Sequence, residues 1–295
     1  MSVAPPGFGP PHHPAPPGEL PELPEGASTR PPWRPWTAWA ALLLGFAGAF
    51  AAALGLGIIA AIGGASLHPT PGWVTLTATV LQDVSLIAAA VFFAARVGGR
   101  ARPVDFGLRR PAEPGAAVGY AVACLVAFFL FTGAWVAITN AHDSTSNLLE
   151  DLGLHESTLA VIGAGLLVCV VAPIAEEFVF RGYFFTAMRG WRGMLPAAVV
   201  TGLAFGAIHL GSTQVVFLIP LAFFGFALCL VYDRTGSLYP CIAAHSINNA
   251  IAFGSAEGWD WQIVPVAAGA LALITLAART VERLDTTTRS FRATA

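Results

Sequence analysis

Four residues that can do hydrolytic chemistry lie within otherwise apolar stretches of the chain. Glu176 ends one apolar run, His209 ends a second, and a third contains His245 and Asn249 one helical turn apart. A carboxylate can take a proton from water, an imidazole can orient that water, and His plus Asn donors can stabilise an oxyanion. If the three runs form neighbouring helices, these residues predict a site for hydrolysis.

Two charged neighbours of Glu176 have a simpler interpretation. Glu177 and Arg181 are spaced i,i+4, so they share one face of a helix and are expected to form a structural ion pair. Glu176 is turned from Glu177 by about 100° and can face another direction. Asp83 stands alone in its apolar run and is interpreted as a buried hydrogen-bond partner or helper rather than a catalytic group.

Several other hydrolase patterns are missing from the sequence. It has no HExxH, the spacing that puts two zinc-binding histidines on one helix face, and no Gly-x-Ser-x-Gly nucleophile turn. One aspartate within the apolar runs is too few for an aspartyl dyad. The four cysteines lack CxxC spacing and are interpreted as small apolar side chains.

The composition indicates the solvent in which these residues must act. Hydrophobic residues make up 56% of the 295 residues and charged residues only 11%, against about 25% charged in soluble domains. This excludes an ordinary soluble enzyme, a disordered protein and a nucleic-acid-binding protein, which would need a basic excess. The chain is expected to be a polytopic membrane protein whose partner is the lipid bilayer.

Apolar runs long enough for a bilayer occur eight times. A hydrocarbon core about 30 Å thick needs about 20 apolar residues in a helix. The runs cover residues 39–62, 73–95, 115–138, 157–175, 194–210, 213–232, 238–253 and 261–278. The predicted fold is therefore an all-α, polytopic helix bundle with eight transmembrane helices over residues 37–280.

The arginines predict the orientation of this bundle. The sequence has no lysine, and all fifteen arginines fall in alternate connections and the two ends of the chain. By the positive-inside rule these segments are cytoplasmic, so both termini of this multi-pass cell-membrane protein are predicted to be cytoplasmic. Residues 1–36 are rich in proline and predict a disordered tail, and residues 281–295 predict a short basic tail.

Taken in order, the polar segments resemble the three motifs of the CPBP family. The segments are Glu176-Glu177-x-x-x-Arg181, Phe205-x-x-x-His209 and His245-x-x-x-Asn249. The family contains the CAAX prenyl endopeptidases and related bacteriocin-processing and abortive-infection proteins. The resemblance covers about residues 157–254, and it implies an all-helical intramembrane endopeptidase whose site opens to the cytoplasm.

The resemblance also implies a role for each residue. Glu176 is the expected general base, His209 holds or activates the water, and His245 and Asn249 form the oxyanion hole. Glu177 and Arg181 support the site. No cofactor is required in this interpretation, but Glu176, His209 and His245 would also make a ligand set that zinc accepts, so both a metal-free and a zinc mechanism stay open.

The substrate is expected to be a peptide or a membrane-protein tail, with or without an attached lipid. An Arg-only, Ala-rich chain suggests a bacterial genome, in which CAAX prenylation is not the expected chemistry. The alternative function is that of a non-catalytic membrane protein, serving in immunity, as a scaffold or in transport. The cost of placing Glu176, His209, His245 and Asn249 in lipid argues against this alternative.

The positions of Glu176 and His209 along their helices predict how deep each side chain lies in the bilayer. Glu176 lies about 19 residues, or roughly 28 Å, from the start of its apolar run, and His209 lies roughly 22 Å into the next run, which returns from the opposite side. The two side chains can share a water if the first helix starts within residues 148–154 and continues past Arg181, and if the next helix starts near Trp191. Tilt would shorten the remaining difference, and Pro173 offers a place for a kink. We therefore predict a tall, bent helix and functional atoms within one bridging water of each other.

Overall fold

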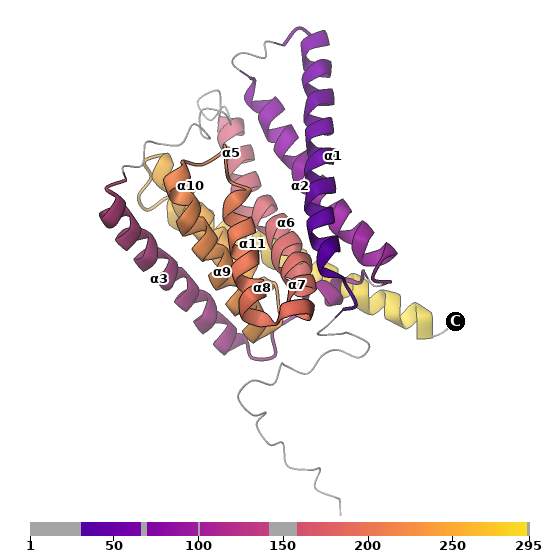
Figure 1. The fold of residues 1–295 in the computed structure, drawn as a ribbon. Helices are drawn as coiled ribbons and strands as arrows, with labels where there is room; N and C mark the ends of the chain where they lie inside the picture. The colour runs from indigo at the N-terminus through magenta and orange to yellow at the C-terminus, as the bar shows by residue number, and fades with distance from the viewer. Residues whose placement is uncertain (1–30, 66–69, 100, 142–157, 294–295) are drawn as a thin grey trace, which may run out of the picture.

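The computed structural model describes residues 31–65, 70–99, 101–141 and 158–293, and every regular element within them is helical. Figure 1 shows the helices gathered in one bundle. In chain order the long elements are α1 (Pro35–Ile62), α2 (Gly72–Arg96), α3 (Pro114–Thr139), a composite helix (Thr158–Arg192), α8 (Met194–Ala207), α9 (Leu218–Thr235), α10 (Tyr239–Ala256) and α11 (Ile263–Ala293). The all-α fold predicted from the sequence is confirmed.

Six of these helices are long and apolar enough to cross a membrane, which makes the chain a polytopic membrane protein. They are α1, α2, α3, the composite helix, η4 (Val215–Phe217) together with α9, and α11. The other two predicted spans correspond to α8, which has 14 residues, and α10, which contains His245 and two asparagines. The eight predicted helices are therefore present, and the crossing of the bilayer by α8 and α10 stays a prediction.

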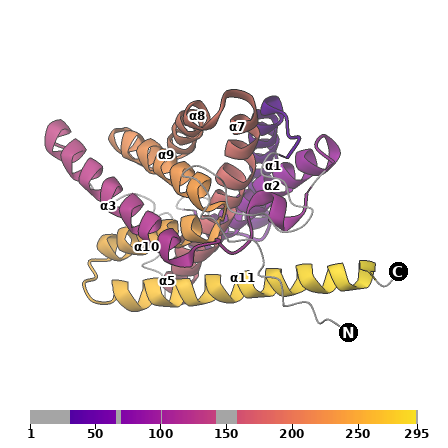
Figure 2. The same ribbon diagram turned by 90° about the horizontal axis from the view of Figure 1, so that it is seen from below.

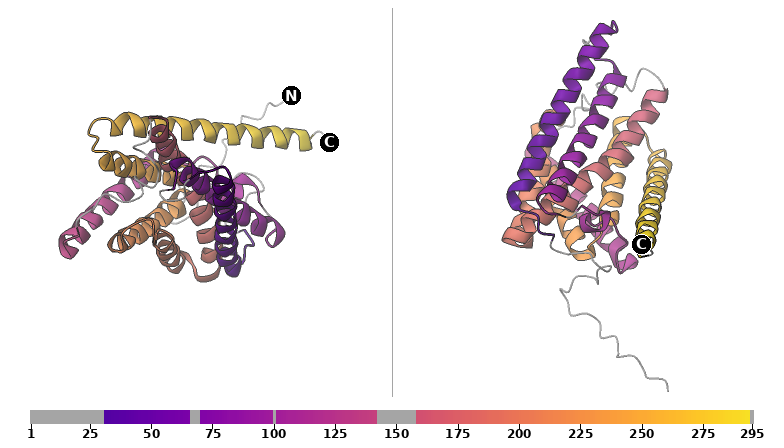
Figure 3. Two further views of the ribbon diagram at one scale, coloured as in Figure 1. Left: turned by 90° about the horizontal axis from the view of Figure 1, so that it is seen from above. Right: turned by 90° about the vertical axis from the view of Figure 1, so that its right-hand side faces the viewer.

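The composite helix is the centre of the bundle. Its middle contacts α1, α2, α8, α9 and α10, whereas α3 packs on α9 and α10, and α11 packs on α10. Seen from below, α11 runs along one side of the molecule and α3 extends to another (Figure 2). The two helices of the α1–α2 hairpin pack mainly against each other, and the right-hand view of Figure 3 shows them side by side at one edge of the bundle. Polar groups on the composite helix thus face several neighbours at once.

The arginine-bearing connections meet at one end of the bundle. The Arg109 Nε atom donates to the Gly236 carbonyl at 2.7 Å, and the Leu238 amide donates to the Gly107 carbonyl at 2.8 Å. Arg189 and Asp233 form an ion pair at 2.7 Å. These contacts join the connection after α2, the end of the composite helix and the α9–α10 turn. Segments that the arginine distribution assigns to one side of the membrane are therefore neighbours in the structure.

Gly107 shapes this end of the bundle. It follows η1 (Pro103–Phe106) with a φ of 91°, a left-handed conformation that favours glycine. A Cβ atom there would approach the Tyr232 ring to 2.5 Å. The Tyr232 hydroxyl donates to the Phe106 carbonyl at 3.1 Å, so the turn and α9 are fixed at close range.

Some of the predicted features lie outside the described residues. They include most of the Pro-rich tail of residues 1–36 and the predicted helix start within residues 148–154. At the other end of the chain, residues 281–293 continue α11 as a helix. The basic segment predicted as a tail is thus helical over most of its length.

Two π-helical segments interrupt the composite helix. It consists of α5 (Thr158–Leu166), η2 (Leu167–Val171), α6 (Ala172–Glu177), η3 (Phe178–Phe185) and α7 (Thr186–Arg192), in which η2 and η3 are π-helical. The predicted continuation past Arg181 is confirmed. Short π-helical segments inside α-helices are found often at functional sites, and here they flank the two adjacent glutamates.

Pro173 explains the first π-helical segment. Proline has no amide hydrogen, and its ring clashes with the carbonyl four residues earlier. The Ala172 amide donates to the Leu167 carbonyl, five residues back. Residue 173 would be the donor for Val168 in this π-helical pattern and for Cys169 in the α-helical pattern that resumes. Two side chains of α10 replace the missing donor: Asn249 Nδ2 donates to the Val168 carbonyl at 2.9 Å, and Ser246 Oγ donates to the Cys169 carbonyl at 2.6 Å.

Removal of the Ser246 hydroxyl is therefore expected to destabilise the bundle. Ser246→Ala leaves the buried Cys169 carbonyl without a donor, which costs about 1–3 kcal/mol of unfolding free energy. In a Pro173→Ala protein, the amide of residue 173 can donate to the Cys169 carbonyl. Ser246→Ala is therefore expected to cost less unfolding free energy in that protein. Thermal unfolding of the four proteins of this cycle measures the difference, with the exposed Ser255→Ala as control. An equal cost in both backgrounds would contradict this account of Pro173.

Small residues bring α8 and α9 into close contact. Cβ atoms added at Gly202 and Gly206, one turn apart on α8, would each lie 2.6 Å from a backbone carbonyl of α9. Such spacing of small residues is the usual means of close helix packing in membranes. Because His209 follows Gly206 by three residues, this contact also fixes the height of His209 in the bundle.

Candidate active site

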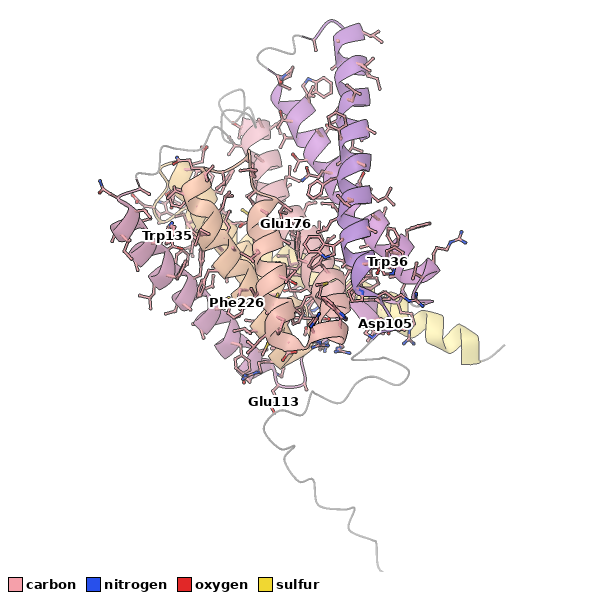
Figure 4. All side chains as sticks on the ribbon, in the orientation of Figure 1. Trp36, Asp105, Glu113, Trp135, Glu176 and Phe226 are labelled. Atoms are coloured by element: carbon pink, nitrogen blue, oxygen red, sulfur yellow. The ribbon has the colours of Figure 1, made fainter. Side chains whose placement is uncertain are left out.

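Glu176 lies inside the bundle and faces two histidines from other elements. Figure 4 shows it in the interior, between the α1–α2 hairpin and the remaining helices. Its Oε2 atom is 4.0 Å from His209 Nε2 and 3.9 Å from His245 Nε2. The Glu176 side chain is 17% exposed and that of His209 is 22% exposed. The three residues predicted to share a water are thus brought together, and the depth conflict disappears because the helix continues to Arg192.

A backbone carbonyl fixes the ring of His209. α8 ends at Ala207, so His209 lies in the turn after the helix rather than within it. Its Nδ1 atom is 2.8 Å from the Phe205 carbonyl oxygen, and because a carbonyl can only accept, Nδ1 carries the hydrogen. In the neutral ring, Nε2 then bears the lone pair and is directed toward Glu176.

A carboxylate fixes the ring of His245 in the same sense. Its Nδ1 atom is 2.7 Å from Glu177 Oε1, and both side chains are buried. The other carboxylate oxygen of Glu177 forms an ion pair with Arg181 Nε at 3.1 Å. Arg181 lies over the Phe205 ring, 4.6 Å from its centroid. The Glu177–Arg181 ion pair predicted from the spacing is therefore present. The hydrogen bond from His245 to Glu177 joins another helix to this pair, and spacing within one helix could not predict it.

The distances from Glu176 to the two histidines can be compared with those of a bridging water and of a zinc ion. At a tetrahedral angle, two hydrogen bonds of about 2.8 Å to one water hold their partners about 4.6 Å apart. Tetrahedral zinc with bonds of about 2.0–2.1 Å would bring its ligand atoms to about 3.4 Å from one another. The side chains of Glu176, His209 and His245 have the chemistry that zinc accepts, and their separations of 4.0 and 3.9 Å lie between these two values.

Three possible acceptors face one another at the site. The Oε2 atom of Glu176 is buried and has no hydrogen-bond partner within the described part of the chain. Facing it are two Nε2 atoms that are also acceptors when their rings are neutral. A water between them has two hydrogens, one for the carboxylate and one for a ring.

Asn249 and Asp83 take different places. Asn249 bonds to η2 through Nδ2, as described above, and its Oδ1 atom accepts from Asn248 at 3.3 Å. One of its two amide hydrogens is thus used to hold the composite helix. Asp83 is buried in α2, which packs against α6, and it interacts electrostatically with Glu176. Its Oδ2 atom has no hydrogen-bond partner among the described residues.

Sequence reasoning missed two residues that position the site. Ser246 holds the Cys169 carbonyl, and the carbonyl of Phe205 orients His209. The ring of Phe205 itself packs on that of Phe180, at 5.3 Å between centroids. Pro173 was the only signal in the sequence for the role of Ser246. A proline within a helix leaves a carbonyl without its backbone donor, so a donor from another element is needed.

The comparisons with known proteins agree with this geometry. Residues 158–251 match the family described as type II CAAX prenyl endopeptidase, Rce1-like. The match begins with the composite helix and ends within α10, so it contains every residue of the Glu176 site described above except Asp83. Neither a curated protein nor a solved structure is similar enough to the chain to give a match. Residues 158–251 of this membrane protein are therefore a domain of the Rce1-like type II CAAX prenyl endopeptidase family.

Proposed function

We propose that the chain is an intramembrane endopeptidase of CAAX type, in which Glu176 activates a water for attack on a peptide bond. One observation carries the proposal: Glu176 Oε2 lies within bridging-water distance of two histidines whose rings are held by other groups. Fixed acceptors and donors around a water are what general-base hydrolysis needs. The family match supports proteolysis as the reaction class.

In the proposed first step, the water oxygen attacks the carbonyl carbon of the scissile bond. Glu176 takes one proton of the water, and the Nε2 atom of neutral His209 accepts a hydrogen bond from the same water. The carbonyl oxygen becomes an oxyanion, which protonated His245 stabilises through its Nε2 hydrogen. The second amide hydrogen of Asn249 is the other proposed oxyanion donor.

In the proposed second step, the tetrahedral intermediate collapses. Glu176 passes its proton to the leaving nitrogen, the oxyanion reforms the carbonyl as the carbon–nitrogen bond breaks, and a carboxylic acid and an amine are released. The proton of the acid then passes to the amine, which leaves a carboxylate and an ammonium group. Glu177 keeps the Nδ1 hydrogen of His245 in place throughout, and Arg181 balances the charge of Glu177. The substrate is proposed to be a peptide or a membrane-protein tail, with or without a lipid.

Peptide cleavage by the purified protein tests this proposal and the zinc alternative together. The substrates are a farnesylated peptide ending in a CAAX sequence and the same peptide without the lipid. Cleavage that persists with a strong zinc chelator is expected, because in the proposed step Glu176 alone serves as the base for the water. Loss of cleavage with chelator and its recovery with zinc would instead make Glu176, His209 and His245 ligands.

We also propose that both termini lie on the cytoplasmic side. In Figure 1 the start of α1 and the end of α11 lie at the same end of the bundle, and the arginine distribution assigns that end to the cytoplasm. Reporter fusions within the N-terminal tail and after Arg292 are expected to report the same, inner side. Opposite sides for the two fusions would contradict an even number of crossings.

A further inference from the structure

A second site lies on the other side of α10 from Glu176. A cavity of about 390 Å³ opens between α10, α11 and the connection that follows α2. Its wall on α10 is formed by Tyr239 and Ala243, and at about 100° per residue Ala243 points about 160° away from His245. The cavity is therefore separate from the proposed active site.

The cavity has an apolar end and a basic end. On α11, the cavity is lined by Leu271, Ile274 and Ala278, which lie on one side of the helix, and by Arg279 at their C-terminal end. From Leu271 to Arg279 the helix rises about 12 Å. Arg110 brings a second guanidinium from the connection before α3. A ligand that fills this space needs an anionic head and an apolar body.

The position of the basic end relative to the bilayer identifies the ligand more closely. The apolar run of α11 ends at Ala278, one residue before Arg279, and Tyr239 is the first residue of α10. Tyrosine is enriched where helices leave the hydrocarbon. Arg110 and Arg279 thus lie at headgroup depth, while Leu271 lies at the depth of acyl chains. Arg110 and Arg279 are both exposed, so a headgroup can reach them.

We propose that this cavity is a binding site for one anionic phospholipid. Its phosphate lies between Arg110 and Arg279, and the first part of an acyl chain follows the apolar side chains that line the cavity on α11. Basic pockets between helices on the cytoplasmic side suit such headgroups, and each arginine near the surface contributes to their attraction. The proposal is independent of catalysis at Glu176.

Lipid binding by the full-length protein in mixed micelles tests the proposal. The probes are a fluorescent phosphatidylglycerol and a phosphatidylcholine with the same label. Wild-type protein is expected to bind one phosphatidylglycerol per chain and to prefer it at least tenfold over phosphatidylcholine. Arg279→Gln and Arg110→Gln are each expected to weaken the binding about fivefold. Ala278→Phe, which fills the cavity and keeps both charges, should abolish it.

The control is Arg234→Gln, which removes an exposed arginine from the end of α9, outside the cavity. It is expected to leave the affinity unchanged. An equal loss in Arg234→Gln, an unaffected Ala278→Phe protein, or equal affinity for the two lipids would overturn the proposal. Displacement of the lipid by millimolar inorganic phosphate would also overturn it, because the site would then bind the charge without the chain.

Discussion

Replacement of Glu176 by glutamine is expected to leave a folded protein that has almost no peptide-cleaving activity. The amide keeps the size of the side chain but cannot take a proton from water. General acid–base catalysis contributes about 10²–10⁴-fold to such reactions, so we expect kcat to fall by at least that much. Because Glu176 Oε2 has no hydrogen-bond partner within the described residues, the change should not lower the unfolding temperature.

A matched control separates this effect from a general loss of negative charge. Glu113→Gln makes the same chemical change at an exposed position before α3, and it should keep both cleavage and stability. Cleavage at the wild-type rate by Glu176→Gln protein would rule out Glu176 as the general base. Inactivity of the wild-type protein toward every peptide tested would favour the non-catalytic alternative.

The neighbouring substitution, Glu177→Gln, is expected to destabilise the protein and to impair catalysis. The side chains of Glu177 and Arg181 are both 0% exposed, and removal of one partner from a buried ion pair costs about 3–5 kcal/mol. His245 loses its carboxylate partner at the same time, so its ring is no longer held in the orientation that turns Nε2 toward Glu176. Thermal unfolding and cleavage assays should therefore both show a loss.

A double substitution can separate these two effects. Glu177→Gln combined with Arg181→Met removes the unpaired guanidinium, and it should recover much of the stability but not the activity. As a control, Glu113→Gln makes the same chemical change at an exposed position, and it should leave stability and activity unchanged. Full activity in Glu177→Gln protein, with unchanged stability, would contradict the role of Glu177 as the group that positions His245.

The helices and their order could be predicted from the sequence because the bilayer imposes a length on each one. The apolar run at residues 39–62 became α1, and that at 115–138 became α3, each within a few residues. α11 was predicted less well. The polar residues after Ala278 suggested a tail, but continuation of helical hydrogen bonding needs no apolar side chains, and the helix extends to Ala293.

The candidate site was predictable only in part. Helical spacing places His245 and Asn249 on one stripe, but it cannot say which neighbouring helix that stripe faces. The convergence of Glu176 with His209 and His245 was expected from the family resemblance and the order of the motifs. The bond from Glu177 to His245 and the use of Asn249 on the composite helix depend on the relative positions of two helices, which no periodicity within one helix contains.

The π-helical segment η2 decides which residue of the composite helix faces the histidines. One extra residue in a helical turn rotates everything that follows by about 100° relative to an uninterrupted α-helix, the same angle that separates adjacent residues. If residues 167–171 ran as ordinary α-helix, Ala175 would take the angular position of Glu176, and Glu176 that of Glu177. The phase of the helix, set by Pro173 and by two side chains of α10, thus decides which residue lies beside the histidines. A single-residue insertion upstream of Ala175 that left the rest of the helix unchanged would place a methyl group there instead of an acid, without altering any residue of the motif.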